Sequence, residues 1–301
     1  MYFLIPWLVI KYRSWRILWK INPALENGGW WGEKKSSIDQ LLRPMAPQQS
    51  LRSLRLPSSL QAAQLKAELA KAGLTFPLVL KPDQGKQGRG VLQIKDLNQL
   101  ENELHKSLLA EVYVQEFCAL PVEAGLLVYR IPGQSGIQIF SLTIKNFPKV
   151  VGDGKHNLLK LCLNDQNLRL WIKVFRQVTP SLDWEEVLPS GQEKFLNWLG
   201  NHTKGCIYED AIDCIKAENL ESVQGIFAAE PNLDFVRFDL KFENLEKFQL
   251  GEFKIIEMNG AGAESINIHD PRYSLVDAYR ILFRQWSLLF EIGKSRQKPP
   301  R

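Results

Sequence analysis

The alternation of apolar and polar residues along the chain predicts both helices and strands. Residues 59–72, 97–110 and 274–293 repeat apolar side chains at the spacing of one helix face, so each is expected to form an amphipathic helix. Residues 76–81 ("FPLVLK") and 90–95 ("GVLQIK") are β-rich segments on either side of a glycine-rich stretch. This arrangement is the sequence signal of a β-hairpin.

Further strands are expected in the middle of the chain and near its end. They cover residues 111–117, 124–132, 136–148, 149–151, 235–243 and 253–260. Residues 157 to about 199 are expected to be mainly helical, and residues 43–60, punctuated by proline and without a period, are expected to form a linker. This order lacks the regular alternation of a doubly wound sheet and predicts an α+β fold.

Composition narrows the function classes. At 301 residues and 45% hydrophobic, the chain can bury one large lobe or two modest ones. A net charge of +5 is mild for this size, which argues against a dedicated nucleic-acid binder and leaves room for anionic small ligands. The four cysteines have neither CxxC spacing nor a nearby histidine pair, so free thiols in a reducing cytoplasm are expected rather than structural zinc.

The N-terminus, "MYFLIPWLVIKYRSWRILWK", is apolar first and basic afterwards. That order does not match a signal peptide, and the apolar run is too short to span a bilayer. Two interpretations remain open: residues 1–20 pack on the protein's own core, or they lie on an anionic membrane surface at the inner membrane face. The second interpretation uses these residues: Trp7, Lys11, Arg13, Trp15, Arg16, Trp19 and Lys20.

The stretch "KPDQGKQGRGV" places glycines and basic residues between the two hairpin segments. One interpretation is a turn that uses glycine for positive φ. The other is a basic lid whose backbone amides approach phosphate oxygens. The lid would use Lys81, Gly85, Lys86, Gly88, Arg89 and Gly90.

Two later strands carry polar residues at alternate positions. Arg237 and Asp239 in "VRFDL" share one face of their strand, and so do Glu257 and Asn259 in "IIEMNG". If the strands are neighbours, a guanidinium, two carboxylates and a carboxamide lie together. These oxygens suit Mg²⁺ rather than zinc. The alternative is an ordinary amphipathic hairpin with ion pairs.

The stretch "EVYVQEFCALPVE" is a strand that leads into a loop. Backbone groups at Glu116 and Phe117 could meet an adenine edge, and Glu123 could accept the ribose hydroxyls. Any half-exposed strand end offers the same groups.

Together these three stretches, in this order, resemble the ATP-grasp superfamily of carboxylate–amine ligases, which includes D-alanine:D-alanine ligase and cyanophycin synthetase. The resemblance covers roughly residues 70–290, and it is closest to bacterial D-alanine:D-alanine ligase-like proteins through "NPALENGG", "VQEF", "VVGDGK", "GNHTKG" and "EMNGAGAE". It implies two α+β lobes with ATP between them. Residues 56–145 would form the N-terminal lobe with its lid, and residues 146–295 the C-terminal lobe with the metal site. Residues 1–55 depart from classical members, which begin with a full Rossmann-like domain: either this segment is a reduced replacement for that domain, or substrate binding is organised differently.

The resemblance also implies residue roles. Lys81 would reach the ATP phosphates, Glu116 and Phe117 would form the adenine hinge, and Glu123 would bind ribose. Arg237 would steady the transferred phosphoryl group. The metal ligands would be Asp239, Glu257 and Asn259, with Glu257 between two Mg²⁺ ions that Mn²⁺ could replace.

The implied reaction is phosphorylation of a carboxylate by ATP, followed by displacement of phosphate by an amine. Substrate contacts are expected among Arg130, Lys155, Asn201, His202 and Lys204, for which surface turns are the alternative. His269, with no partner of the right type nearby in sequence, is expected to be structural. A nucleotide-binding module that regulates or scaffolds at a membrane, and a kinase-like enzyme, remain rival hypotheses. The acid, the amine and the oligomeric state stay open.

Overall fold

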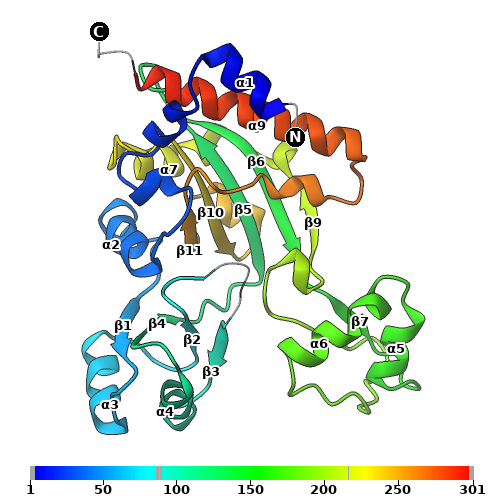
Figure 1. Cartoon of the computed structure of the whole chain (residues 1–301). Helices are drawn as coiled ribbons and strands as arrows, with labels where there is room; N and C mark the ends of the chain where they lie inside the picture. The colour runs from blue at the N-terminus through cyan, green and yellow to red at the C-terminus, as the bar shows by residue number, and fades with distance from the viewer. Residues whose placement is uncertain (1–3, 86–87, 89, 216, 298–301) are drawn as a thin grey trace.

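The computed structural model describes residues 4–85, 88, 90–215 and 217–297. Figure 1 shows a large lobe, a small lobe below it and a satellite segment beside the small lobe. Antiparallel sheets and helices are both present, which confirms the predicted α+β class.

The small lobe is built on a four-stranded sheet in the order β1-β4-β2-β3. Its strands are β1 (Ser53–Pro57), β2 (Leu78–Lys81), β3 (Leu92–Ile94) and β4 (Glu111–Glu116). Strands β2 and β3 pair antiparallel, as the hairpin pattern predicted. Helices α3 (Ala62–Lys71) and α4 (Leu97–Lys106) cover this sheet with their leucine faces and form one apolar core with it.

The large lobe is built on a five-stranded antiparallel sheet in the order β11-β10-β5-β6-β9. Its strands are β5 (Val122–Tyr129), β6 (Gln138–Asn146), β9 (Ile207–Asp210), β10 (Phe235–Phe242) and β11 (Phe253–Asn259).

The two faces of this sheet bury different helices. Even-numbered residues of β10, such as Phe238 and Leu240, pack with α2 (Lys35–Met45), α7 (Ala217–Ala228) and α8 (Leu245–Gln249). The opposite face packs on the long helix α9 (Leu275–Ser295) through residues such as Leu127, Phe235 and Leu289. Because successive strand residues alternate between faces, the odd-numbered residues of β10 all face the α9 side.

The satellite segment has its own apolar cluster, which includes Leu158, Phe175 and Leu196. It contains α5 (Leu158–Asn164), the 3₁₀ helix η3 (Leu168–Trp171), α6 (Ile172–Val178) and a two-stranded sheet of β7 (Lys149–Val151) and β8 (Glu193–Phe195). The expected helical character of residues 157–199 is therefore only partly realised. Three further 3₁₀ turns follow: η4 (His202–Lys204), η5 (Ile212–Cys214) and η6 (Ile266–His269).

The first 55 residues are integrated into both lobes. They contain α1 (Leu4–Tyr12), η1 (Arg16–Lys20), η2 (Glu26–Gly29) and α2, and β1 begins at Ser53. Helix α1 lies along α9, where Leu8 packs with Ile17 and Phe290. The linker expected at residues 43–60 instead holds the last three residues of α2 and all of β1. So short a piece of helix and a five-residue edge strand leave little periodicity beside the prolines.

None of the described helices is both long and apolar enough to cross a membrane. All four cysteines are unpaired.

Candidate active site

One half of the α9-facing side of the large sheet is polar instead of apolar. The register places Arg237 opposite Asn259 and Asp239 opposite Glu257 across β10 and β11. On the other side of β10, Lys241 lies opposite Glu123, which in turn lies opposite Lys145 of β6. Directly paired residues of neighbouring strands share a face, so these side chains gather where α9 no longer covers the sheet.

Four side chains on this face form a buried charge network. The Nζ of Lys145 lies 2.9 Å from Glu123 Oε1 and 3.4 Å from Asp239 Oδ1, and the Nε of Arg237 lies 3.1 Å from Asp239 Oδ1. Burial opposes the charged form of Asp239, but Arg237 and Lys145 outweigh it and hold its pKa below the ordinary value. Burial likewise opposes the charge of Lys145, and Asp239 and Glu123 reverse the effect and raise its pKa. Asp239 and Lys145 are therefore both charged at neutral pH.

Two oxygen-bearing side chains beside this network are less completely paired. The Oε1 of Glu257 lies 4.0 Å from Lys35 Nζ, a distance at the limit of an ion pair. The buried Nδ2 of Asn259 has no hydrogen-bond partner in the described part of the chain.

Asp239, Glu257 and Asn259 fit a magnesium site of a particular kind. The described residues contain no group of three or more His, Cys, Asp or Glu side chains placed to hold a metal. Mg²⁺, however, is usually bound by one or two carboxylates together with phosphate oxygens and water. Two facing carboxylates and a carboxamide suit that coordination. A metal beside Asn259 would bind the oxygen of its side-chain amide, not the nitrogen.

The small lobe contributes a buried lysine on the opposite wall. Lys81, at the end of β2, is only 6% exposed and donates to Gln115 Oε1 at 2.6 Å. Gln115 in turn donates to the carbonyl of Ile256 at 3.3 Å and so joins the two lobes. Burial lowers the pKa of Lys81, and Glu257 partly restores it. An anion in front of this ammonium would complete its pairing.

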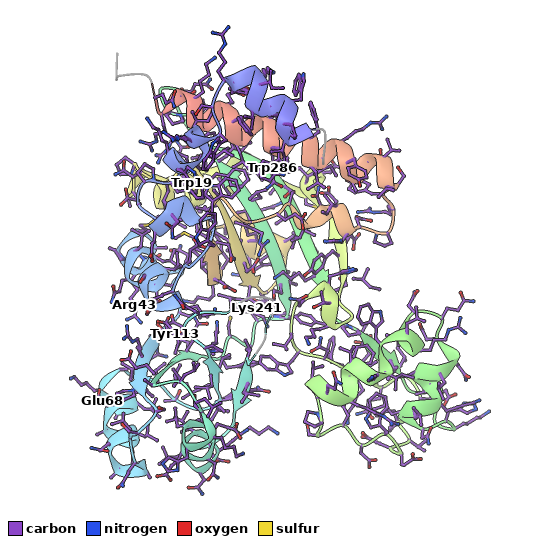
Figure 2. The ribbon with its side chains drawn as sticks, viewed as in Figure 1. Trp19, Arg43, Glu68, Tyr113, Lys241 and Trp286 are labelled. Atoms are coloured by element: carbon purple, nitrogen blue, oxygen red, sulfur yellow. The ribbon has the colours of Figure 1, made fainter. Side chains whose placement is uncertain are left out.

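Both walls enclose one cavity of about 630 Å³. Figure 2 shows Lys241 at the lower end of β10, beside the small lobe. The Nζ of Lys241 lies 5.8 Å from the ring centroid of Phe117, and that ring packs edge-on against Trp198 at 6.4 Å. One end of the cavity is therefore aromatic and cationic, and the middle holds the carboxylates.

The fold is similar to that of solved structures. The D-alanine–D-alanine ligase from Bacillus anthracis superposes with a TM-score of 0.51 at 15% identity, over 90% of this chain and 70% of that one. The chain has an ATP-grasp fold. The same ligase complexed with ATP gives a TM-score of 0.49 at 14% identity, over 89% of this chain and 68% of that one. The bifunctional glutathione synthetase from Pasteurella multocida gives 0.44 at 14% identity, over 87% of this chain and 38% of that one.

This chain therefore spans between about a third and two thirds of the length of these ATP-grasp structures. No protein-family model matches the chain, and neither does any curated protein sequence.

Most of the residues predicted for the ATP-grasp site line the one cavity. They are Lys81, Gly85, Gly88, Glu116, Phe117, Glu123, Asn201, His202, Arg237, Asp239, Glu257 and Asn259. Lys86 and Arg89 of the predicted lid lie outside the described residues. Gly90 is described, but it packs against Pro82 and is not part of the lining.

At the expected adenine hinge, some backbone and side-chain groups already have partners. The carboxylate of Glu116 accepts from the backbone N and the Nε of Arg52 at 2.9 and 2.8 Å. The amide of Glu116 donates to the carbonyl of Arg52 at 2.9 Å, and that of Phe117 donates to Pro77 at 3.4 Å. Because both amides are already bonded, a base would have to be contacted by the carbonyl oxygens of Glu116 and Phe117 or by the next residue, Cys118, which also lines the cavity.

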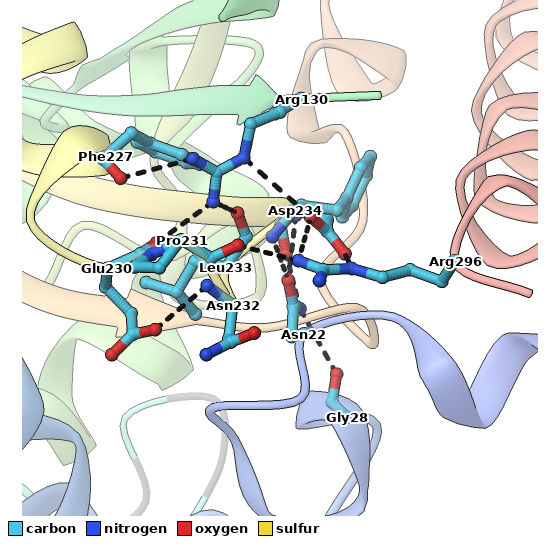
Figure 3. Close-up of polar contacts among 11 residues, drawn as sticks. Asn22, Gly28, Arg130, Phe227, Glu230, Pro231, Asn232, Leu233, Asp234 and Arg296 are labelled. Carbon is cyan, nitrogen blue, oxygen red and sulfur yellow. Dashed lines mark hydrogen bonds and ion pairs between the residues drawn. The ribbon is translucent and has the colours of Figure 1, made fainter. Parts of the chain in front are cut away.

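Arg130 lies outside the lining and supports a loop instead. Its guanidinium donates to the carbonyls of Phe227, at 3.3 Å, and Glu230, at 3.0 Å, and also to that of Leu233 (Figure 3). Its Nε lies 3.9 Å from Asp234, whose buried carboxylate pairs with Arg296. With these partners, Arg130 is not placed to clamp a substrate in this cavity.

Two other expected substrate residues also lie outside the lining. The backbone amide of Lys155 donates to Asp153 in an exposed turn. Lys204, at the end of η4, offers its carbonyl to Asn197. In the same "GNHTKG" stretch Gly200, Asn201 and His202 do line the cavity, and a Cβ at Gly200 would lie 2.0 Å from Glu123 Oε1.

His269, which was expected to be structural, lines the cavity. Its ring stacks on His202 at 4.7 Å, and both rings line the cavity. Burial, with His202 as a second cause, lowers the pKa of His269 and favours its neutral form. The sequence separation of 67 residues between these histidines hid the pair.

The N-terminal segment also supplies part of the wall, which the sequence reasoning missed. Glu33 and Lys35 line the cavity, and Glu33 Oε1 accepts from the amide of Gly260 at 3.2 Å. Lys35 Nζ donates to the carbonyl of Gly85 at 3.2 Å, and Ser36 donates twice to the carboxylate of Asp83. This stretch therefore holds the base of the glycine-rich loop. The available signal was the run "GGWWGEKKS", which has the glycines and charges of a site.

Proposed function

We propose that the chain is an ATP-dependent ligase that activates a carboxylate as an acyl phosphate and joins it to an amine. The observation that supports this most is the position of Arg237, Asp239, Glu257 and Asn259 side by side on one sheet face, in the same cavity as Lys81. A site for nucleotide binding alone does not need a guanidinium beside the metal ligands. The cavity volume of about 630 Å³ is within the range of small-molecule sites.

ATP would bind between the lobes. Phe117 and Trp198 would offer aromatic rings to the base and Lys241 a cation, and Glu123, in the same cavity, would accept the ribose hydroxyls. Lys81 and Lys35 would face the phosphates from the small-lobe side. Asp239, Glu257 and Asn259 would hold Mg²⁺, which supplies positive charge to the phosphate oxygens and screens them from the carboxylates.

The reaction follows from these positions. A substrate carboxylate oxygen attacks the γ-phosphorus, the bond to the β–γ bridging oxygen breaks, and ADP leaves. The amine nitrogen then attacks the acyl carbon and loses a proton, the bond from that carbon to the phosphate oxygen breaks, and inorganic phosphate leaves. Arg237 would donate to oxygens that gain negative charge in both steps, and Asp239 keeps its guanidinium in position. No protein nucleophile takes part.

An ADP-release screen tests this proposal. Purified protein would be assayed with MgATP and a matrix of amino acids, short peptides, hydroxy acids and amines. We expect steady turnover only when an acid and an amine are both present. ADP release with a hydroxyl compound alone would indicate kinase-like transfer, and tight ATP binding without turnover on any pair would indicate a binding module.

A carboxamide substitution tests the metal site. In Glu257→Gln we expect the Mg²⁺-dependent part of nucleotide affinity to fall by about tenfold or more, because a charged ligand becomes neutral. Titration calorimetry with a non-hydrolysable ATP analogue, with and without Mg²⁺, measures it. Glu252→Gln is the matched control, since that carboxylate pairs with Lys247 outside the cavity. Equal magnesium dependence in both variants would count against the proposed site.

A further inference from the structure

Helices α1 and α9 together expose an apolar, aromatic surface. Trp7 is 47% exposed, Ile10 75%, Tyr279 49% and Phe283 44%. Trp7 and Phe283 meet at a centroid distance of 5.8 Å, which joins the two helices. Residues three or four apart share a helix face, so Ile10 continues the surface along α1 and Tyr279 along α9. We call these four residues the α1–α9 surface.

The exposed side of α1 is not its packing side. Leu8, on the inner side, is fully buried against Ile17 and Phe290. Trp7 and Ile10 therefore remain outside after α1 has packed on the protein's own core. Contiguous exposed apolar side chains of this size usually mark an interaction site.

The charges around this surface are of one sign along α1 and the turn after it. The first 25 residues contain Lys11, Arg13, Arg16 and Lys20, and the first acidic residue of the chain is Glu26. The Nζ of Lys11 lies 5.0 Å from the centroid of Trp7, so the cation and the indole are presented together. On α9, Arg280 follows Tyr279 and is exposed, although it pairs with Asp277 at 3.0 Å, so the positive charge comes mainly from α1 and the turn after it. Tryptophan and tyrosine among lysine and arginine match the interface of an anionic bilayer.

We propose that the α1–α9 surface docks the protein on an anionic phospholipid bilayer, with α1 lying in the headgroup region. Helix α1 has nine residues, so at about 1.5 Å per residue it lies on a bilayer rather than across it. Figure 1 shows α1 and α9 at the end of the large lobe that is remote from the small lobe. Docking there leaves the cavity between the lobes open to soluble substrates.

Vesicle co-sedimentation of the full chain tests this inference. We expect binding to vesicles of phosphatidylcholine with phosphatidylglycerol and little binding to phosphatidylcholine alone. The double variant Lys11→Glu/Arg16→Glu should weaken binding to anionic vesicles by about tenfold or more, since each basic residue near such a surface adds about 1 kcal/mol. Lys66→Glu/Lys71→Glu, exposed on α3 in the other lobe, changes the net charge equally and should bind as the unmodified protein does.

A second readout locates the contact. Brominated acyl chains quench tryptophans that enter the bilayer, and we expect part of that quenching to disappear in Trp7→Phe while binding is kept. Ile10→Ser should weaken binding without changing the melting temperature. Equal binding to neutral and anionic vesicles, equal loss in both charge variants, or a concentration-dependent dimer with no vesicle binding would each overturn the proposal.

Discussion

At the scale of single residues, Lys35 shows how the N-terminal segment takes part in the site. Its side chain is 14% exposed and lies between Glu257, at 4.0 Å, and the carbonyl of Gly85, at 3.2 Å. Burial lowers the pKa of Lys81, and the positive charge of Lys35 lowers it further, because the two ammonium groups repel each other. A polyphosphate between them would turn that repulsion into two attractions.

We expect Lys35→Met to weaken ATP affinity by about tenfold, which corresponds to about 1.4 kcal/mol and to the loss of one charge-assisted contact. The methionine keeps most of the buried stem, so the fold should not change. Titration of a non-hydrolysable ATP analogue measures the effect, and Lys34→Met, on the exposed neighbour, serves as the control. Indistinguishable affinities of the two variants would show that Lys35 does not meet the phosphates.

Sequence reasoning could find residues that one strand presents at alternate positions. The two-residue period of a strand predicted that Arg237 and Asp239 share a face, and that Glu257 and Asn259 do too. That the two strands are neighbours was an assumption, and the pairing of β10 with β11 confirms it. Lys145 could not be found this way, because its contact with Glu123 and Asp239 depends on β5 lying between β6 and β10. Strand order is a property of the whole sheet and is not encoded in local spacing.

At the scale of elements, η2 and the loop after β11 approach each other at backbone distance. A Cβ on Gly29 would lie 2.6 Å from the Cα of Gly260 and 2.9 Å from Glu33 Oε1. The same loop leads from Asn259 into the part of the cavity that contains Glu264. The glycines therefore let the N-terminal segment pack closely against the loop that follows β11.

We expect Gly29→Ala to lower stability by about 2 kcal/mol or more and to weaken ATP binding, because the methyl group forces the two loops apart. Gly29 has a φ of +74°, which adds a separate backbone penalty. Gly133→Ala is the matched control, since its φ is +86° and nothing lies within 4 Å of the added Cβ. Urea denaturation of both variants isolates the steric part, and equal losses would mean that the close approach is unimportant.

The connection between β9 and η6 depends on one carboxylate. Asp270 accepts from the amide of Asp210 at 2.7 Å and from Arg272 Nη2 at 2.6 Å. Chiefly through Arg272, these bonds lower the pKa of Asp270 from 3.8 to about 2. A depressed folded-state pKa stabilises the fold above the ordinary value and loses that contribution as pH falls through the folded value.

We therefore expect Asp270→Asn to destabilise the protein by about 1 kcal/mol at neutral pH, with the deficit shrinking between about pH 4 and pH 2. Unfolding free energies measured by urea across that range test the expectation. Asp213→Asn, on an exposed residue of η5, is the control. A deficit that stays constant down to pH 2 would mean that ionisation of Asp270 does not contribute.

Some elements were predictable from the sequence and others were not. The β2–β3 hairpin and helix α9 follow from strong patterns. Helix α2 buries Ile38, Leu42 and Met45 at helical spacing, but Pro44 and the polar residues around it gave the stretch a linker-like composition. Strand β7 was predicted at its observed bounds, whereas its partner β8 lies in the stretch that was expected to be mainly helical.

At the scale of the whole molecule, the N-terminal segment has two structural roles: one part packs on α9 and another part lines the cavity. Helix α1 and η1 cover α9, and the residues from η2 to α2 complete the cavity and support the glycine-rich loop. The same N-terminal segment therefore contacts α9 at one end of the large lobe and lines the cavity between the lobes. The two sides of α1 also differ: the inner side packs on the protein's core, and the outer side carries the exposed α1–α9 surface.

Helix α1 therefore offers a test that separates its inner side from its outer side. We expect Leu8→Ala to lower the free energy of unfolding by about 2–4 kcal/mol, because a fully buried leucine leaves a cavity against Ile17 and Phe290. Leu170→Ala, at a leucine that is 73% exposed, should change it by less than about 0.5 kcal/mol. Urea denaturation in the absence of lipid measures both. Equal stability of the two variants would mean that α1 does not pack on α9 in solution. A large loss for Leu8→Ala alone would show that α1 is part of the folded core in the absence of a membrane.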